Sequence, residues 1–244
     1  LLTRQPDSTL NPAVVQLFNR RVRAWFILCV ILALGFLTQE LLGFDATTIL
    51  FFGISFFALR EFITITPTRL GDHRALFWVF FVFAPLQYAL IFIEPYLPDL
   101  DSVVVGPGPD LYGLYSILLP VYAFLFVFTR VALAGDPRRF LERTAKIQAA
   151  LLICVYALSF APALTYLDLQ TIKTPDGSWA PWEGSKQGLL FYFVLIVQLS
   201  DLFQFVGSRS LGGEPIAEEI NASRTWRGFF FSVAMTAFCA AGLS

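Results

Sequence analysis

The sequence has few of the residues that build disulfide frameworks or protein metal sites. Only three cysteines and one histidine occur in 244 residues. Cys29, Cys154 and Cys239 each lie in an apolar stretch, where cysteine typically behaves as a small hydrophobic residue. His73 stands alone at the edge of an apolar run, and we interpret it as a residue of the membrane interface. These counts exclude a disulfide scaffold and a Cys/His zinc site.

Charged residues are also scarce, at 14% of the chain against about 25% in ordinary soluble domains. Hydrophobic residues make up 57%, which is more apolar surface than a soluble protein of this size can bury. The net charge of -1 leaves no basic excess, so we exclude nucleic acid as a partner. The composition predicts an integral membrane protein with lipid as its environment.

Seven hydrophobic segments are each long enough to cross the bilayer core, about 30 Å thick, as a helix. They lie near 24–43, 46–63, 75–93, 111–133, 147–167, 187–207 and 227–243. Helices are expected because the hydrocarbon core offers no water to satisfy backbone polar groups. Pro85, Pro120 and Pro162 fall within three of the segments and predict kinks. We predict an all-α fold, a polytopic membrane bundle of about seven transmembrane helices, as a single transmembrane domain over residues 1–244.

The positive residues predict the orientation of this bundle. In a seven-span arrangement, fifteen of the seventeen Lys and Arg residues fall on one side, and only Lys173 and Lys186 fall on the other. By the positive-inside rule the first side is cytoplasmic.

The sixth span carries the polar side chains that most suggest chemistry. Gln198, Asp201, Gln204 and Ser208 share one broad helical face, because residues three or four apart are neighbours on a helix. A carboxylate in lipid costs a few kcal/mol, so Asp201 should face a protein cavity and have a cation or donor as its partner. The alternative is a packing pair with Arg209 or with an arginine of another helix.

The segment 216–228 leads from this span into the seventh and is the second candidate region. Its arginines, Arg224 and Arg227, suit phosphate binding beside a helix N-terminus. A purely structural interpretation stays open, in which Asn221 or Ser223 caps the helix, Trp226 anchors the membrane interface, and the arginines follow the positive-inside rule.

Taken together, the two segments resemble the phosphatidate cytidylyltransferases, also called CDP-diacylglycerol synthases, in a bacterial branch of the family. The matching positions are Asp201, Gln204, Arg209, Gly212, Ile216, Ala217, Arg224, Thr225, Trp226 and Gly228. Further likeness covers 58–62, 66–69, 72–78, 85–88, 120–124 and 139–146. No single motif is specific, but their joint order is.

The resemblance implies the reaction of CTP with phosphatidate, giving CDP-diacylglycerol and pyrophosphate with Mg²⁺ at the cytoplasmic face of the bacterial inner membrane. It makes Asp201 the metal ligand and, with Arg224, a catalytic residue. The remaining implied roles are nucleotide or phosphate binding by Arg209, Asn221, Thr225, Trp226 and Gly228, and a substrate cavity lined by Arg60, Glu61 and Gln204. The implied partners are phosphatidate, CTP and membrane lipid, and a homodimer is compatible with this assignment.

The sequence departs from the family at several positions. The family usually has Ser-Pro-x-Lys-Thr-Trp-Glu-Gly at 221–228, so Arg224 keeps a charge while Arg227 reverses one. The family's C-terminal signature, with a second acidic cluster, has no counterpart in these 244 residues, and an upstream span is also missing. We therefore expect the chain to be part of a longer protein. Two other hypotheses stay open: an ion-coupled secondary transporter using Asp201 and the proline-broken helices, and an inactive membrane scaffold.

Overall fold

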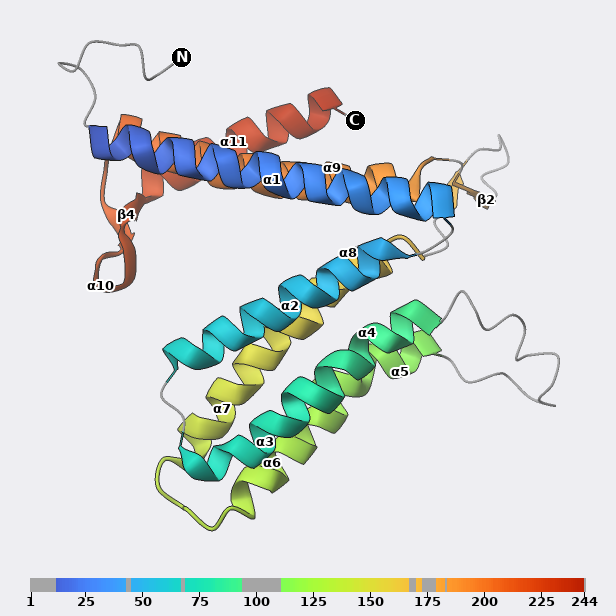
Figure 1. Ribbon diagram of the computed structural model, residues 1–244. Coiled ribbons are helices and arrows are strands. Elements are labelled where there is room, and N and C mark those ends of the chain that lie inside the picture. The colour runs from blue at the N-terminus through green and yellow to red at the C-terminus, as the bar shows by residue number, and fades with distance from the viewer. Residues whose placement is uncertain are drawn as a thin grey trace. The chain divides into compact units, whose positions relative to one another are not determined.

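The computed structural model describes residues 12–42, 45–66, 69–93, 111–166, 170–172, 179–182 and 184–243 (Figure 1). The helices are α1 (Pro12–Leu42), α2 (Ala46–Ile65), α3 (His73–Trp78), α4 (Ala84–Ile93), α5 (Leu111–Ile117), α6 (Phe124–Ala132), α7 (Phe140–Leu151), α8 (Leu158–Ala163), α9 (Lys186–Leu211), α10 (Glu218–Asn221) and α11 (Trp226–Leu243). The strands form two antiparallel pairs, β1 (Gln170–Ile172) with β2 (Trp179–Pro181) and β3 (Pro215–Ala217) with β4 (Ala222–Thr225). The chain divides into two compact units, residues 31–183 and residues 1–30 with 184–244.

The all-α membrane architecture is confirmed. Six helical stretches in the described residues are long and apolar enough to cross a membrane, and they match six of the seven predicted segments. They are Ala46–Ile65, His73–Ile93, Tyr112–Ala132, Phe140–Ala163, Lys186–Leu211 and Trp226–Leu243. The first predicted segment, 24–43, lies in α1, whose apolar part Val22–Thr38 is shorter than the others. The chain is therefore a multi-pass membrane protein, and the two short strand pairs are additions that the sequence did not predict.

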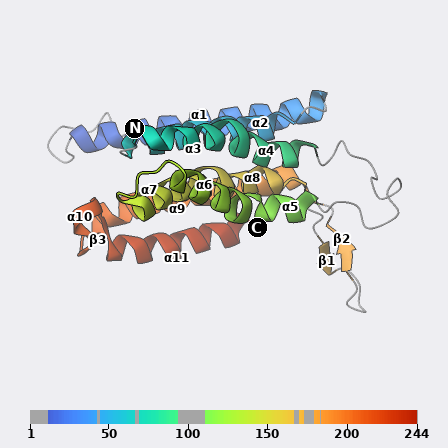
Figure 2. The same cartoon turned by 90° about the horizontal axis from the view of Figure 1, so that it is seen from below.

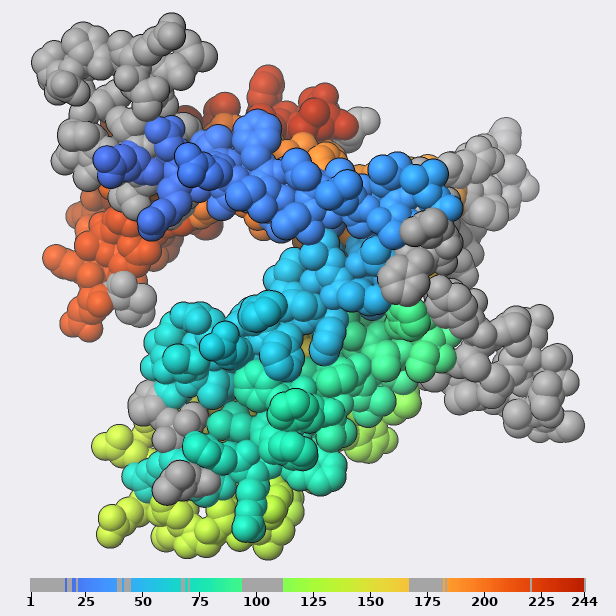
Figure 3. Space-filling model, viewed as in Figure 1, coloured from blue at the N-terminus to red at the C-terminus, as the bar shows by residue number. Residues whose placement is uncertain are grey.

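Unit 31–183 is built from four of these stretches packed side by side (Figure 1). Its fully buried side chains come from every stretch and include Leu59, Val79, Leu119, Val127 and Leu151. In the space-filling view, the side chains of α2, α3 and α4 share the visible face of this unit, and yellow-green atoms from the end of α6 emerge beside them (Figure 3). Close packing of these apolar side chains accounts for the assembly of the unit.

Buried polar groups in this unit bond to one another across helices. Gln87 donates to the hydroxyl of Ser159 and to the backbone carbonyl of Tyr115, both at 3.3 Å, and the Tyr115 and Ser159 hydroxyls lie 2.8 Å apart. Ser55 and Tyr88 form a short hydroxyl pair between α2 and α4. These bonds hold the helices in register, since lipid provides no competing partners.

Three of the membrane stretches change from α- to π-helical hydrogen bonding partway along. The π-helical segments are Val79–Phe83, Leu118–Ala123 and Leu152–Ala157. The first ends two residues before Pro85 and the second contains Pro120. The missing N–H groups of these prolines interrupt the α-helical ladder. Pro162 lies inside α8. The helices therefore continue through Pro85 and Pro120 with this local change of hydrogen bonding, whereas Pro162 lies in an α-helical segment.

Helices α9 and α11 form an antiparallel hairpin in the other unit (Figure 2). The Tyr192 hydroxyl donates to the carbonyl of Ala240 at 3.0 Å, and the Ser232 hydroxyl donates to the carbonyl of Ser200 at 2.7 Å. Near the start of α11 the helices touch at Gly207 and Gly228, where a Cβ atom on Gly207 would lie 3.2 Å from the Gly228 Cα. Small residues at such crossings let two membrane helices approach closely.

Candidate functional site

The candidate site is at the end of α9, where the chain turns back through a short hairpin into α11. Gly212 and Gly213 have φ values of 58° and 107°, which glycine adopts without strain, and they end the helix. Pro215 then pairs with Thr225, and the N–H of Trp226 donates to the carbonyl of Glu214 at 3.1 Å. The hairpin therefore returns β4 to the last turns of α9.

One guanidinium joins the two candidate segments. Arg224 on β4 donates from Nη2 to Oδ1 of Asp201 at 2.5 Å and from Nη1 to Oε1 of Gln204 at 2.8 Å. The Arg224 side chain is 22% exposed and that of Asp201 is 41% exposed, so the pair is open to solvent on one side. The face predicted on the sixth span is confirmed for Asp201 and Gln204, which bind the same cation. Arg224 is a partner of Asp201 and lies on β4, whereas the packing alternative named Arg209 or an arginine of another helix.

Two predicted nucleotide-binding residues have clear structural roles. Thr225 is buried, its N–H donates to the hydroxyl of Ser208 at 3.2 Å, and its own hydroxyl accepts the N–H of Gly228 at 3.2 Å. Thr225 is therefore the cap of α11, and the alternative that Asn221 or Ser223 caps this helix is wrong. Gly228 is required for packing, because a Cβ atom there would lie 2.1 Å from the Ser208 hydroxyl.

The other residues of the loop lie at the surface. The Asn221 side-chain oxygen accepts the N–H and hydroxyl of Ser223, at 3.1 and 2.6 Å, and so shapes the tip of the hairpin. Trp226 is 49% exposed and stacks against Phe230. Exposed aromatic rings near the end of a membrane helix are typical of interfacial anchors.

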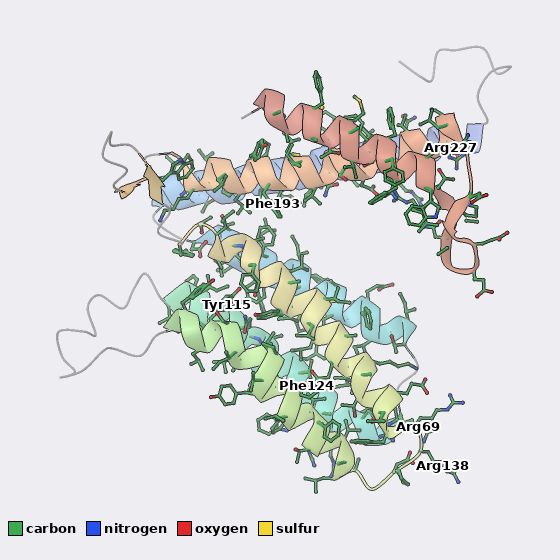
Figure 4. The ribbon with its side chains drawn as sticks, turned by 180° about the vertical axis from the view of Figure 1, so that it is seen from behind. Arg69, Tyr115, Phe124, Arg138, Phe193 and Arg227 are labelled. Carbon is green, nitrogen blue, oxygen red and sulfur yellow. The ribbon has the colours of Figure 1, made fainter. Side chains whose placement is uncertain are left out.

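Two further arginines lie in this part of the chain, which also holds Glu214, Glu218 and Glu219. Arg209 is exposed, with its guanidinium 5.3 Å from the centre of the Phe205 ring. Arg227 is also exposed, at the start of α11 in Figure 4. Its side chain passes close to Gly213, where an added Cβ atom would lie 3.0 Å from the Arg227 Cδ. Together with Arg224 these side chains offer three cations within one short segment of chain.

Arg60 and Glu61, the predicted cavity residues of the second span, belong to the other unit. Both are exposed near the end of α2. They are therefore accessible at the end of a membrane stretch, and their role in a substrate cavity stays a prediction.

The carboxylates of the described residues bear directly on the predicted metal. No group of three His, Cys, Asp or Glu side chains that could hold an ion occurs among them. Asp201 is the acidic member of the cluster with Arg224 and Gln204. Mg²⁺ in nucleotide sites is commonly held by one or two carboxylates together with substrate phosphates and water. The donor set fits this kind of shared site, and it does not form an all-protein metal cage.

A second ionic cluster, which the sequence analysis missed, lies at one end of unit 31–183. The buried guanidinium of Arg143 binds both oxygens of the buried Asp72 at 2.5 to 3.0 Å. It also lies 3.3 Å from Asp136, which pairs with Arg69 at 2.5 Å. Figure 4 shows Arg69 and Arg138 at this same end. The separation of 71 residues between Asp72 and Arg143 left no local signal of their pairing.

The Arg69 guanidinium, together with the backbone N–H of Arg138, lowers the pKa of Asp136 below its ordinary value. Hydrogen bonds to the charged form of a carboxylate have this effect. Asp136 therefore stays ionised and holds Arg69 at the edge of the cluster.

Comparison with known proteins places the sequence in context. A profile described as "Cytidylyltransferase family" matches residues 19–244, which include both candidate segments. The chain is 25% identical over 216 residues to the "Uncharacterized protein YnbB" of Escherichia coli (strain K12). That match covers 87% of this chain and 59% of the relative, so the chain spans less than two thirds of the relative's length. No solved structure matches.

Proposed function

The chain belongs to the cytidylyltransferase family, and from this membership we propose that the whole protein transfers the cytidylyl group of CTP to phosphatidate, releasing pyrophosphate and forming CDP-diacylglycerol. The family supports a nucleotidyltransferase that uses CTP. The lipid acceptor is consistent with the multi-pass membrane architecture, because a water-insoluble substrate must be met at the membrane.

The observation that carries this proposal is the binding of Arg224 to both Asp201 and Gln204. It places a cation and a carboxylate 2.5 Å apart at the end of a membrane helix, on a surface that solvent reaches. A triphosphate needs neutralising cations, and a carboxylate beside them can hold the metal that accompanies it. Arg209 and Arg227, exposed in the same segment of chain, are further candidates to bind the phosphates of CTP.

The reaction balances without any further reactant. An oxygen of the phosphatidate phosphate attacks the α-phosphorus of CTP, a new P–O bond forms, and the bond between the α-phosphorus and its bridging oxygen breaks. The electron pair leaves with pyrophosphate. Phosphoryl-type transfers depend mainly on positioning and charge neutralisation. Gln204 and Asp201 hold Arg224 in position before CTP binds, and Arg224 would then turn to neutralise the phosphates.

We assign Asp201 as the carboxylate that holds Mg²⁺ in the nucleotide complex. The ion would neutralise charge on the phosphate oxygens. Because Oδ1 of Asp201 is bonded to Arg224 in this structure, the assignment requires Arg224 to transfer its hydrogen bonds to the nucleotide phosphates. The predicted location, with this end of α9 on the cytoplasmic side of a bacterial inner membrane, rests on the distribution of positive residues.

The test uses the full-length protein purified in detergent with mixed micelles of phosphatidate. We expect CTP-dependent formation of a radioactive lipid from α-labelled CTP, with release of one pyrophosphate per product, and loss of both when Mg²⁺ is chelated. ATP and GTP should substitute poorly for CTP. A full-length, folded protein that binds CTP without turnover would contradict the proposed activity and favour the inactive scaffold. Coupled uptake of a solute into vesicles without nucleotide transfer would favour the transporter.

A further inference from the structure

A pocket of about 390 Å³ opens at one end of unit 31–183, between the beginning of α3 and the end of α6. Its lining residues are Gly71, Arg74, Arg130, Leu133 and Ala134. The volume is more than ten times the share of one liquid water molecule, about 30 Å³, so a phosphate ester has room to enter. None of these residues belongs to the site proposed for nucleotide transfer.

The pocket lies in a region with an excess of positive charge. Among the described residues of 69–93 and 111–146, seven cations accompany three carboxylates. The cations are Arg69, Arg74, Arg130, Arg138, Arg139, Arg143 and Lys146, and the carboxylates are Asp72, Asp136 and Glu142. The region therefore favours an anionic ligand.

All three carboxylates are bound to cations other than the two in the pocket. Asp72 binds Arg143, Asp136 binds Arg69 and Arg143, and Glu142 binds Lys146 at 2.6 Å. Within the described part of the chain, no carboxylate lies within salt-bridge distance of Arg74 or Arg130. Two guanidinium groups that line one pocket without acidic partners form a site for an anion with several oxygens, such as a phosphate.

The apolar surroundings indicate where such a phosphate would come from. Leu133, which lines the pocket, is 72% exposed, and Trp78, one helical turn after Arg74, is 39% exposed. Exposed tryptophan at the end of a membrane helix marks the level of the lipid headgroups. A ligand there would have its phosphate beside the arginines and its acyl chains along the apolar helix surface.

We propose that the Arg74–Arg130 pocket binds the phosphate of an anionic phospholipid headgroup, at a site separate in sequence from the catalytic segments. Basic pockets between membrane helices are known to bind anionic headgroups. Bound lipid would neutralise the two arginines and bridge α3 and α6, which stabilises this end of the unit. The proposal goes beyond nucleotide transfer and does not depend on it.

The experiment measures binding of phosphatidylglycerol by the delipidated full-length protein, with native mass spectrometry and without CTP. We expect the double variant Arg74→Gln/Arg130→Gln to weaken this binding about twenty-five-fold, because each guanidinium in contact with the phosphate contributes about fivefold. The control Arg138→Gln/Arg139→Gln removes the same charge from the same end outside the pocket and should change binding by less than threefold. Equal losses in both double variants would show that only general surface charge acts and would overturn the proposal.

Four further arms complete the test. Arg74→Lys/Arg130→Lys keeps the charge and should retain most of the binding, which guards against a simple folding defect in the Gln variant. Phosphatidylcholine should bind weakly to every variant, and glycerol phosphate should compete poorly. Competition by glycerol phosphate as strong as that by the lipid would overturn the lipid assignment in favour of a soluble phosphate. Asp201→Asn should retain phosphatidylglycerol binding, so failure of the proposed catalysis and failure of this site are distinguishable.

Discussion

The guanidinium of Arg224 lies 2.5 Å from the carboxylate of Asp201, across 23 residues of chain. This contact joins the end of a membrane helix to the hairpin that follows it. Because both side chains are partly exposed, the ion pair contributes little to stability, on the order of 0.2–1 kcal/mol. The partial exposure of this cation and carboxylate agrees with a role in substrate binding better than with a role in holding the fold together.

Asp201→Asn is therefore expected to reduce cytidylyl transfer by the full-length protein at least a hundredfold while changing the unfolding free energy by less than about 1 kcal/mol. The substitution keeps the shape of the side chain and removes its charge. Initial rates and thermal unfolding of the same preparation measure the two effects. Glu214→Gln, an exposed carboxylate of the same hairpin, is the control and should leave the rate within about twofold. Normal Mg²⁺-dependent turnover in Asp201→Asn would remove Asp201 from the mechanism.

Much of the architecture could be predicted because it depends on local patterns. Long apolar runs identified six of the membrane stretches, and helical periodicity placed Asp201 and Gln204 on one face. The contact between Asp201 and Arg224 could not be predicted from such local patterns. It depends on how Gly212 and Gly213 turn the chain and on the register that places Thr225 opposite Pro215. The packing roles of Thr225 and Gly228 follow from that same register.

Arg224→Lys tests whether the site requires the two-pronged geometry of a guanidinium. Lysine keeps the positive charge but cannot bind Asp201 and Gln204 through two nitrogens held in one plane. We expect a tenfold or greater fall in kcat/KM and a smaller effect for Arg227→Lys, whose side chain is exposed. Steady-state kinetics with varied CTP measures both. Full activity in Arg224→Lys would mean that charge alone suffices at this position.

Gly228→Ala should destabilise the contact between α9 and α11. A Cβ atom at this position would lie 2.1 Å from the Ser208 hydroxyl and 2.6 Å from the Ser208 backbone nitrogen, so the helices must separate. Overpacking of this kind costs about 1–3 kcal/mol. Thermal unfolding in detergent measures the loss. Gly242→Ala in the same helix is the matched control, because a Cβ atom there meets nothing within 4 Å, and it should be neutral or slightly stabilising. Equal stability of the two variants would contradict the close approach of the helices.

Arg143→Gln should be among the most damaging single substitutions in unit 31–183. Arg143 and Asp72 are both buried, and removal of the cation leaves the Asp72 carboxylate without its charge partner. Breaking a buried ion pair in this way costs about 3–5 kcal/mol. The exposed Arg138 offers the control, since Arg138→Gln should change stability by less than about 0.5 kcal/mol. The double variant Asp72→Asn/Arg143→Gln should recover part of the loss, and its failure to do so would mean that the ion pair is not the cause.

Asp136 makes the stability of the same cluster depend on pH. Arg69 and the backbone N–H of Arg138 lower the pKa of this carboxyl in the folded protein, so its contribution is complete above the unfolded value, about 3.9. As the pH falls from that value through the folded pKa, the carboxylate is protonated and its contribution is lost.

The wild type should therefore be more stable than Asp136→Asn by a constant amount above pH of about 5, and the difference should shrink below pH of about 4. Thermal unfolding in detergent across this range measures the difference. Glu219→Gln, an exposed carboxylate in α10, should show no comparable convergence. A difference between wild type and Asp136→Asn that stays constant down to pH 3 would mean that the Asp136 charge contributes nothing to the fold.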